Sequence, residues 1–341
     1  MRSGEGTPPT APERHAPLVS VVTPFYDTAD HLAECIGSVL AQTLGDFEYI
    51  LADNRSTDGS REIAEAYAAK DPRVRFVAFD EHLPQLANYN RALRLMHPDA
   101  RYCKVAQADD VLMPRCLEEM VALAETDEAI GLVGAYTLRQ DRVALDALDF
   151  RERVVEGAEI VRRFLLGGRY VLGNPTTCLY RAERVRECQG FFPTDLMTGD
   201  THAALRLLRR GRFGFIHQVL TVCRRRPGSI SSDWPDFGSG PVGLRVALEL
   251  HGDLLAPDVL ARQRRRWARV HHRVLAKGAL TGRPPAFWHF HRHELAAAGL
   301  RIERGGVALA TLGLVGGALL NPGQSAQRVA RWIRRRARPR P

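Results

Sequence analysis

The sequence predicts an α/β fold in which a mostly parallel sheet carries helices on both faces and a helical region follows it. Two observations lead to this prediction. Short apolar runs rich in β-branched residues alternate with segments of helical periodicity as far as residue 137, a rhythm typical of βαβ units. After Ser232 the strand-like runs stop, and only helical patterns follow.

Five runs are interpreted as buried strands, because they are short, apolar and bounded by turn residues. The first is LVSVVT, which Pro24 ends. Between the runs, apolar residues such as Leu32, Ile36 and Val39 recur three and four positions apart, which predicts helices. The predicted strands are Leu18–Thr23, Phe47–Ala52, Val74–Phe79, Tyr102–Ala106 and Gly131–Thr137.

The C-terminal third is predicted to be helical, at Val242–Leu255, Val259–Leu275 and Pro285–Leu300. Gly305–Gln327 then carries no charged residue. Its apolar part, GVALATLGLVGGALL, is shorter than the roughly 20 residues of a spanning helix. Because NPG at 321–323 interrupts it, we expect a buried or interfacial hairpin.

The chain is therefore expected to have four parts. Residues 1–16 are polar and rich in Pro and Gly, with no apolar core of a signal peptide, so they are predicted to be a disordered lead. The six cysteines are scattered without metal-binding spacing, which favours free thiols in a reducing cytosol. The remaining parts are an α/β domain (17–232), a helical extension (233–304) and an apolar hairpin with a basic amphipathic tail (305–341).

The formal charge of +9 is concentrated at the C-terminus. From Arg328 onward the chain carries seven arginines and no acid. A basic tail suits an anionic membrane surface or a nucleic acid. Because an apolar segment precedes the basic tail, an anionic membrane surface is favoured as the partner, and no nucleic-acid partner is expected. A helical cap with a frayed basic tail is the alternative.

Polar residues follow three of the predicted strands, at Pro24–Asp27, Asp53–Ser56 and Asp109–Asp110. In a parallel sheet, ligands bind outside the carboxyl ends of the strands. Paired acids at such an edge repel each other unless a cation offsets their charge. Each acid alone has a simpler explanation as a helix cap, but three clusters at one edge favour a binding site.

Six motifs in order resemble the family 2 glycosyltransferases, which have the GT-A nucleotide-sugar-binding fold. The resemblance covers residues 17–232. VVTPFYD is similar to the family's first strand and P-x-Y-N turn, with Asp27 in place of Asn. The other motifs are ILADNRSTDGS, LANYNRAL, QADDVLMP, MTGDTHAALRLLRRGRFGFI and VCRRRPGSIS.

The resemblance implies an inverting transferase that moves a sugar from a nucleotide sugar, with UDP or dTDP favoured, to a hydroxyl of a glycan or lipid-linked acceptor. It implies that Asp109 binds Mg²⁺ or Mn²⁺ against the donor diphosphate. It also implies that Asp200 is the base that takes the acceptor's proton. The residues implied to bind the nucleotide sugar are Pro24, Tyr26, Asp53, Arg55, Asn90, Asp110 and Arg226.

Three positions depart from the family's pattern. Gln107 replaces the first acid of D-x-D, Gly199 replaces the acid before the base, and Arg226 replaces a histidine. A neutral amide binds Mg²⁺ more weakly than a carboxylate does, so we expect a weak metal dependence. Arg226 matches phosphate oxygens and is expected to share the electrostatic work.

The predicted function is glycan synthesis at the cell surface or on a lipid carrier. The protein is expected to be cytoplasmic and peripheral at the inner face of the cell membrane. One alternative is a nucleotidyltransferase, although PFYDTAD lacks the glycine-rich phosphate loop that class would need. The other is a non-catalytic protein that binds a nucleotide sugar or a membrane, favoured by the two missing acids.

Overall fold

The computed structural model describes residues 16–224 and 237–320, which form two compact units. Unit 1 consists of the described residues within Met1–Ala144, Gly173–Phe191 and Gly214–Cys223. Unit 2 consists of those within Leu145–Leu172, Phe192–Phe213 and Arg224–Pro341. Unit 2 therefore takes two segments from inside the predicted 17–232 domain.

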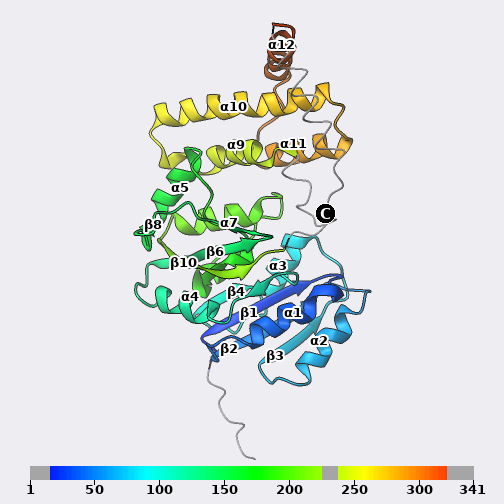
Figure 1. Ribbon diagram of the computed structural model, residues 1–341, viewed down its shortest axis with the longest axis vertical. Helices are drawn as coiled ribbons and strands as arrows, with labels where there is room; N and C mark the ends of the chain where they lie inside the picture. Colours follow the sequence, from blue (N-terminus) through cyan, green and yellow to red (C-terminus); the bar gives the residue numbers. More distant parts are fainter. Residues whose placement is uncertain (1–15, 225–236, 321–341) are drawn as a thin grey trace, which may run out of the picture. The chain divides into compact units, whose positions relative to one another are not determined.

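Unit 1 is built on a sheet with the strand order β3-β2-β1-β4-β9-β6-β10-β5, and β7 pairs with β6 (Figure 1). Strands β3, β2, β1 and β4 run parallel. Strand β9 is antiparallel to β4 and to β6, and β10 is antiparallel to β5. The strands are β1 (Val19–Phe25), β2 (Phe47–Asp53), β3 (Val74–Ala78), β4 (Tyr102–Val105), β5 (Val111–Leu112), β6 (Ile130–Arg139), β7 (Arg142–Ala144), β9 (Cys178–Arg181) and β10 (Arg212–Val222).

The five predicted strands all form, and the α/β class is confirmed. Every residue of β1 is buried, as expected for a strand whose sheet is covered on both faces. The predicted fifth strand, β6, runs in the same direction as β4, as a βαβ unit requires, but β9 lies between the two and is antiparallel to both. The short strand β9 was not predicted, and it enters the sheet between β4 and β6.

Helices α1 and α2 lie on one face of β1, β2 and β3 (Figure 1). Their apolar residues face the sheet, and α1 buries the predicted Leu32, Ile36 and Val39. The helical elements of unit 1 are α1 (Ala29–Leu40), α2 (Ser60–Ala68), α3 (Gln85–Leu93), α4 (Cys116–Ala124), the 3₁₀ turn η1 (Pro175–Thr177) and α6 (Ala182–Arg186).

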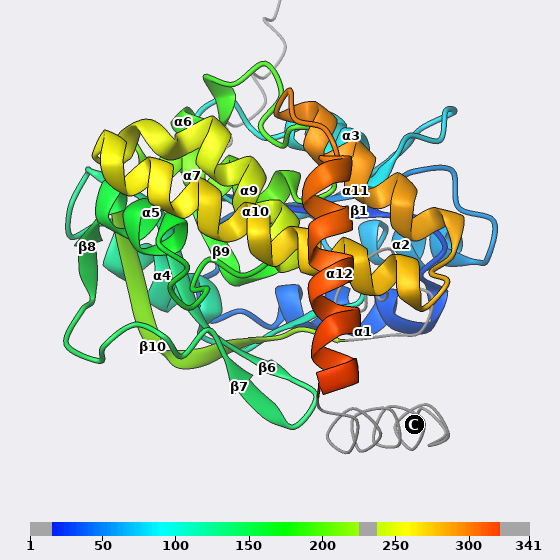
Figure 2. The same ribbon diagram turned by 90° about the horizontal axis from the view of Figure 1, so that it is seen from above.

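Unit 2 is largely helical, and its last helix crosses α10 (Figure 2). The three helices predicted in the C-terminal third are present as α9, α10 and α11. The apolar segment forms one helix to Leu320, and the turn predicted at 321–323 lies outside the described residues. The elements are β8 (Val154–Glu156), α5 (Gly157–Leu165), α7 (Gly199–Leu208), α9 (Ser239–His251), η2 (Gly252–Leu254), α10 (Pro257–Leu280), α11 (Pro285–Ala297) and α12 (Arg304–Leu320).

A chain of hydrogen bonds joins three helices inside unit 2. Arg245 of α9 donates from Nη1 to Nδ1 of His271 on α10, over 3.2 Å. The other ring nitrogen of His271 lies 3.0 Å from Nδ1 of His291 on α11. Nε2 of His291 lies 2.9 Å from the carbonyl oxygen of Phe237. Because a guanidinium only donates, each imidazole accepts at Nδ1 and donates at Nε2.

All six cysteines are free thiols, and five of them are buried. Within residues 16–224 and 237–320, none of the helices combines the length and the hydropathy that crossing a membrane requires.

Buried histidines predict an acid-sensitive unit 2. Burial lowers the pKa of His202 to about 3, of His251 to about 4, of His271 to about 2 and of His291 to about 4, from 6.5. Below pH 6.5 the unfolded chain therefore binds protons that the folded unit does not, so stability is present above that pH and is lost as the pH falls. Between about pH 7.5 and 5.5, the free energy of unfolding should fall by about 1 kcal/mol per buried histidine.

Urea denaturation across this pH range measures the effect. His251, whose Nε2 lies 3.2 Å from Nδ1 of His202, offers a test of the cause. His251→Gln should flatten the pH dependence, whereas the same change at the exposed His289 should leave it intact. An equally steep dependence in both variants would contradict the assignment.

Candidate active site

The turns that follow β1 and β2 are joined by hydrogen bonds. Asp27 has a left-handed backbone, with φ of 46°, and its Oδ1 accepts from the N–H of Thr57 over 2.8 Å. The N–H of Asp27 donates to Oγ of Ser56 over 3.1 Å. Aspartate tolerates this backbone region better than most residues. The carboxylate at position 27 therefore fixes one loop against the other.

Asp58 extends this connection to the start of α1. Its Oδ2 accepts from the N–H of Ala29 over 2.9 Å, and Ser60 Oγ accepts from the N–H of Thr28 over 2.8 Å. Burial opposes the charge of Asp58, but the hydrogen bonds from Ala29 and Ser60 hold its pKa below the usual value. The free N–H groups of α1 are thus satisfied by side chains from the next loop.

Asp53 lies beneath this loop, with none of its side chain exposed. Its Oδ1 accepts from the N–H of Ser56 over 2.8 Å, and its Oδ2 accepts from Nε of Arg61 over 3.0 Å. Arg55 lies on the exposed side of the same loop, with φ of 71°. Asp53 therefore shapes the segment that presents Arg55.

Two aromatic rings meet at this edge of the sheet. Tyr26 is 44% exposed, and its ring centroid lies 4.4 Å from that of His82, edge to face. The neighbouring Asp27 carboxylate raises the pKa of the Tyr26 phenol. Asn54 holds the loop of His82, because it exchanges hydrogen bonds of 2.8 and 3.0 Å with the backbone of Leu83. Sequence reasoning had identified Tyr26 but not His82.

The register places the acid pair beside these loops. Phe25 pairs with Asp53 at the end of β1 and β2, and Val22 pairs with Val105 of β4 on the other side. The chain leaving β4 therefore reaches Asp109 and Asp110 next to the β1 turn. Unit 1 thus brings the three predicted clusters to one sheet edge. Asp109 is half-buried, and Asp110 is 3% exposed.

Gln107 is held by neighbours on both sides. Its Nε2 donates to the hydroxyl of Tyr89 over 3.1 Å, and its Oε1 accepts from the hydroxyl of Thr176 over 3.3 Å. Its backbone N–H donates to Thr176 Oγ1 over 3.1 Å. We expected the amide oxygen of Gln107 to be a weak metal ligand, but that oxygen has a protein partner.

Asp110 is oriented by residues that sequence reasoning missed. Asn174 donates from Nδ2 to Asp110 Oδ2 over 3.3 Å, while its Oδ1 accepts from Thr177 N–H and from the Cys223 thiol. Burial, and then the charge of Asp110, raise the pKa of Cys223 and of Cys35 to about 12, so both thiols stay protonated. The Asn-Pro step that begins η1 was the available signal, since such steps initiate turns.

Lys104 anchors the segment that carries Asn174 and Thr176. Its side chain is fully buried in β4. Its Nζ donates to the carbonyl oxygens of Thr176 and Cys178, the latter over 3.1 Å. Through these bonds β4 fixes η1, and η1 in turn contacts Gln107 and Asp110. A lysine is rarely buried without such partners.

Asn90 of α3 lines a pocket in unit 1. It is 9% exposed and lines a pocket of about 400 Å³ together with Leu93, Met96 and Phe191. Pro24 is buried at the end of β1, where it pairs with Ala52. Arg226 lies outside the described residues.

Asp200 belongs to unit 2, in the first turn of α7. It is half-buried, and its Oδ1 accepts from the N–H of Thr201 over 2.7 Å. The preceding loop is held by Glu294 of α11, which accepts from Met197 N–H over 2.6 Å and from the Thr198 hydroxyl over 3.0 Å. Burial raises the pKa of Glu294. Position 199 lacks an acid, but a carboxylate from another helix organises this loop.

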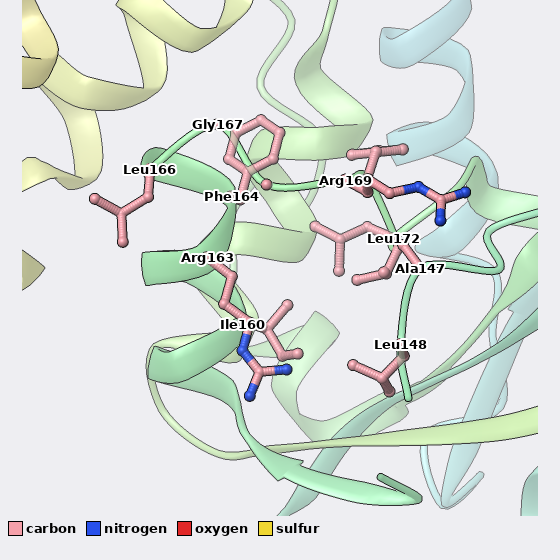
Figure 3. A pocket seen from close by; sticks show the side chains of 12 residues that line it. Ala147, Leu148, Ile160, Arg163, Phe164, Leu166, Gly167, Arg169 and Leu172 are labelled. Atoms are coloured by element: carbon pink, nitrogen blue, oxygen red, sulfur yellow. The ribbon is translucent and has the colours of Figure 1, made fainter. Parts of the chain in front are cut away.

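A pocket of about 400 Å³ lies in unit 2 (Figure 3). Leu148, Ile160 and Phe164 line its walls. Tyr170 also lines it, and its hydroxyl lies 2.9 Å from Oγ1 of Thr201, the residue after Asp200. The two arginines of the lining are paired with acids, Arg163 with Glu152 and Arg169 with Asp146. The pocket is therefore mainly apolar, with its charges compensated.

The side chains of Asp109 and Asp110 offer carboxylate oxygens, which are hard ligands that suit Mg²⁺ or Mn²⁺. Across the described residues no group of three or more His, Cys, Asp or Glu is placed to hold a metal. A site made of Asp109, with Asp110 beside it, fits an ion whose remaining ligands are phosphate oxygens and water, as Mg²⁺ commonly takes.

Comparison with known sequences identifies residues 20–187 as matching the family model for Glycosyl transferase family 2. A Bacillus subtilis (strain 168) protein named as a teichuronic acid biosynthesis glycosyltransferase, TuaG, is 33% identical over 38% of this chain and 51% of its own. Another from the same strain, named as a glycosyltransferase, EpsE, is 32% identical over 51% of this chain and 60% of its own. The chain thus spans about half to three-fifths of these relatives.

Solved structures share the fold. S. aureus TarS in complex with UDP-GlcNAc has a TM-score of 0.58 and 18% identity, covering 82% of this chain and 80% of its own. A mannosyltransferase from Pyrobaculum calidifontis, in complex with GDP-Man and Mn²⁺, has a TM-score of 0.50 and 20% identity, covering 90% and 81%. Both therefore support the predicted fold of this chain.

The buried Lys104 makes a direct test of the site's architecture. Lys104→Met should leave the carbonyls of Thr176 and Cys178 without their donor, at a cost of about 2 kcal/mol in the free energy of unfolding. The matched control Lys277→Met, at an exposed position of α10, should change it by less than about 0.5 kcal/mol. Urea denaturation measures both, and equal stabilities would show that Lys104 anchors nothing.

Proposed function

Since residues 20–187 match the family model for Glycosyl transferase family 2, we propose that this chain is an inverting glycosyltransferase of that family. It transfers a sugar from a nucleotide-sugar donor to a hydroxyl of an acceptor. The observation that carries the proposal is the meeting of four loops at one sheet edge. They bring the Tyr26–His82 ring pair, the Asp53 loop with Arg55, and the acids Asp109 and Asp110 to the carboxyl ends of β1, β2, β3 and β4.

Each part of this edge suits one part of a nucleotide sugar. The exposed Tyr26 ring offers an apolar face to the base, and Pro24 fixes the turn below it. Asp53 holds the loop so that the Arg55 guanidinium is available to an anionic group. Asp110 is assigned to the sugar, in the orientation that Asn174 gives it. Asn90, more deeply placed, is proposed to support the donor from the α3 side.

The acceptor is activated by Asp200. Its carboxylate takes the proton of the acceptor hydroxyl as that oxygen attacks the anomeric carbon, while the bond from that carbon to the diphosphate oxygen breaks. Glu294 fixes the loop before Asp200, because it accepts two hydrogen bonds from Met197 and Thr198. That support replaces the acid missing at position 199.

Asp109 is the residue proposed to hold Mg²⁺ or Mn²⁺. When bound, such an ion offsets the charge that develops on the leaving diphosphate. With the Gln107 amide held by Tyr89 and Thr176, Asp109 and Asp110 are the acids that remain in the segment QADD, which supports a weak metal dependence. Arg226 is proposed to add a cation to the same diphosphate.

The donor nucleotide is proposed to be UDP or dTDP, and the nucleotide sugars bound by the fold neighbours, UDP-GlcNAc and GDP-Man, extend the candidates. The product is proposed to be a cell-surface or lipid-linked glycan, a choice supported by the name of the teichuronic acid relative. The proposed place of work is the cytoplasmic side of the cell membrane, with the protein peripheral on an anionic surface.

The apolar pocket of unit 2 is proposed to hold part of the acceptor. Tyr170 connects its wall to Thr201, next to Asp200. Its volume is in the range of small-ligand pockets. Its paired charges suit a neutral group rather than an anion.

Transfer should depend on Asp200. A thermal-shift screen against UDP, dTDP and GDP first identifies the nucleotide, because a bound ligand raises the apparent stability. With the matching sugar donor, Asp200→Asn should lower transfer on the order of 10²-fold or more and leave donor binding unchanged. Near-normal transfer by this variant would move the base elsewhere. Donor binding without transfer by the unaltered protein would identify a non-catalytic binding protein.

The metal response should depend on Asp109. Asp109→Ala should abolish activation by Mn²⁺ or Mg²⁺, since no other carboxylate is assigned to the ion. Arg226→Ala should raise the donor KM or lower kcat while preserving the metal response. Titration of activity with Mn²⁺ measures both. Full activity in excess chelator, unchanged by Asp109→Ala, would show that the acid pair serves another purpose.

A further inference from the structure

Helix α12 exposes an apolar surface that is unusual for a helix in water. Its 17 residues contain one charge, Arg304 at the first position, and none of them is buried. At about 1.5 Å per residue the helix is about 25 Å long. Its large apolar side chains are highly exposed: Leu309 73%, Leu312 70%, Leu319 76% and Leu320 82%.

The exposed leucines lie along one side of the helix. Leu309, Leu312, Leu319 and Leu320 fall within one arc at the spacing of an α-helix, and we call them the leucine stripe. Half-buried residues such as Val307, Ala310 and Leu314 fall on the opposite side. Figure 2 shows α12 lying across α10, so one side of α12 packs on α10 while the leucine stripe faces outward.

The start of α12 is fixed to the helices below it. Glu303, just before the helix, accepts from Nη2 of Arg245 over 2.7 Å. Gly306 lies so close to His272 of α10 that an added Cβ would come within 2.2 Å of the imidazole. The leucine stripe is therefore held outward by its attachment to α10.

The supporting helix α10 is strongly basic. Arg266, Arg269, Arg273 and Lys277 are exposed and recur three or four positions apart, on one face. In the part of the chain that the structure describes, Arg269, Arg273 and Lys277 form no ion pair with an acid. Arg269 lies three residues before His272 and Arg273 directly after it, so these cations belong to the part of α10 that contacts the start of α12.

We infer that α12 and the basic face of α10 form a docking surface for an anionic lipid bilayer, with the leucine stripe in the acyl boundary and the cations at the headgroups. Apolar burial and attraction to anionic lipids act together on such a surface. The seven arginines from Arg328 onward in the sequence carry the same sign. This inference shares the membrane location with the proposed function but does not depend on its catalysis.

A second copy of the chain is the competing occupant, and the charge argues against it. Pairing two leucine stripes would bring two basic α10 helices together, in a chain that already carries a formal charge of +9. Like charges at such an interface repel each other. An anionic bilayer offers the opposite sign over the same area.

Vesicle co-sedimentation of the full chain tests the inference without any activity. The chain should sediment with phosphatidylcholine vesicles that contain phosphatidylglycerol, should bind phosphatidylcholine alone far less, and should be released by high salt. Leu309→Glu with Leu319→Glu should reduce partitioning on the order of tenfold or more. The matched control is Leu250→Glu, at a 42% exposed leucine of α9, which should bind like the unaltered chain.

A second pair of variants separates charge from apolar contact. Arg269→Glu with Arg273→Glu should remove most of the dependence on phosphatidylglycerol, whereas Arg142→Glu, at an 86% exposed arginine of unit 1, should not. Binding that ignores lipid charge and both pairs of variants would overturn the inference. A dimer in size-exclusion chromatography with light scattering, lost in the leucine variant and accompanied by no vesicle binding, would assign α12 to a second copy instead.

Discussion

Lys104 lies fully buried at the junction of the two halves of the sheet, where β4 is parallel to β1 on one side and antiparallel to β9 on the other. Its Nζ reaches the carbonyl oxygens of Thr176 and Cys178, at the end of η1 and the start of β9. Without Lys104, both carbonyl oxygens would lose this donor, which is costly in an apolar interior. Lys104 therefore fixes the position of η1.

The candidate site depends on that position. Once η1 is fixed, Thr176 holds Gln107 and Asn174 holds Asp110, so the chain leaving β4 is tied to η1 at two residues. The neighbouring thiols of Cys35 and Cys223 remain protonated and add no charge. The result is a rigid acid pair at the sheet edge, supported by neutral hydrogen-bonding groups. Preorganised groups of this kind suit the binding of a cationic or metal-bridged ligand.

Much of the fold could be predicted from local sequence patterns. The runs at β1, β2 and β4 are continuous and apolar, because helices cover both faces of the sheet there. The positions of Asp53, Asp109 and Asp110 followed from the rule that polar residues after parallel strands share an edge. These predictions needed only the order and type of neighbouring residues.

The supporting network could not be predicted in the same way. Thr176 lies 69 positions from Gln107 and 72 from Lys104, and nothing local indicates such partners. From sequence alone, a lysine in an apolar run is expected to be a strand residue that faces water. The burial of Lys104 is explained only by its hydrogen bonds to the carbonyl oxygens of Thr176 and Cys178. Glu294 was missed for the same reason, since it reaches the Asp200 loop from 96 positions away. Long-range hydrogen bonds leave little trace in one sequence.

The histidine chain of unit 2 has a direction. The guanidinium of Arg245 can only donate, so it determines which nitrogen of His271 carries hydrogen, and His271 determines the same for His291. The chain of hydrogen bonds ends at the carbonyl oxygen of Phe237, which can only accept. The hydrogen bonds that join helices α9, α10 and α11 therefore allow only one tautomer of each imidazole, and the reverse direction of donation is excluded. If one helix slid by a turn, these hydrogen bonds would break and the buried donors and acceptors would lose these partners. The three helices can therefore keep this hydrogen-bond chain in only one register. The buried polar contacts thus specify the helix register in addition to apolar packing.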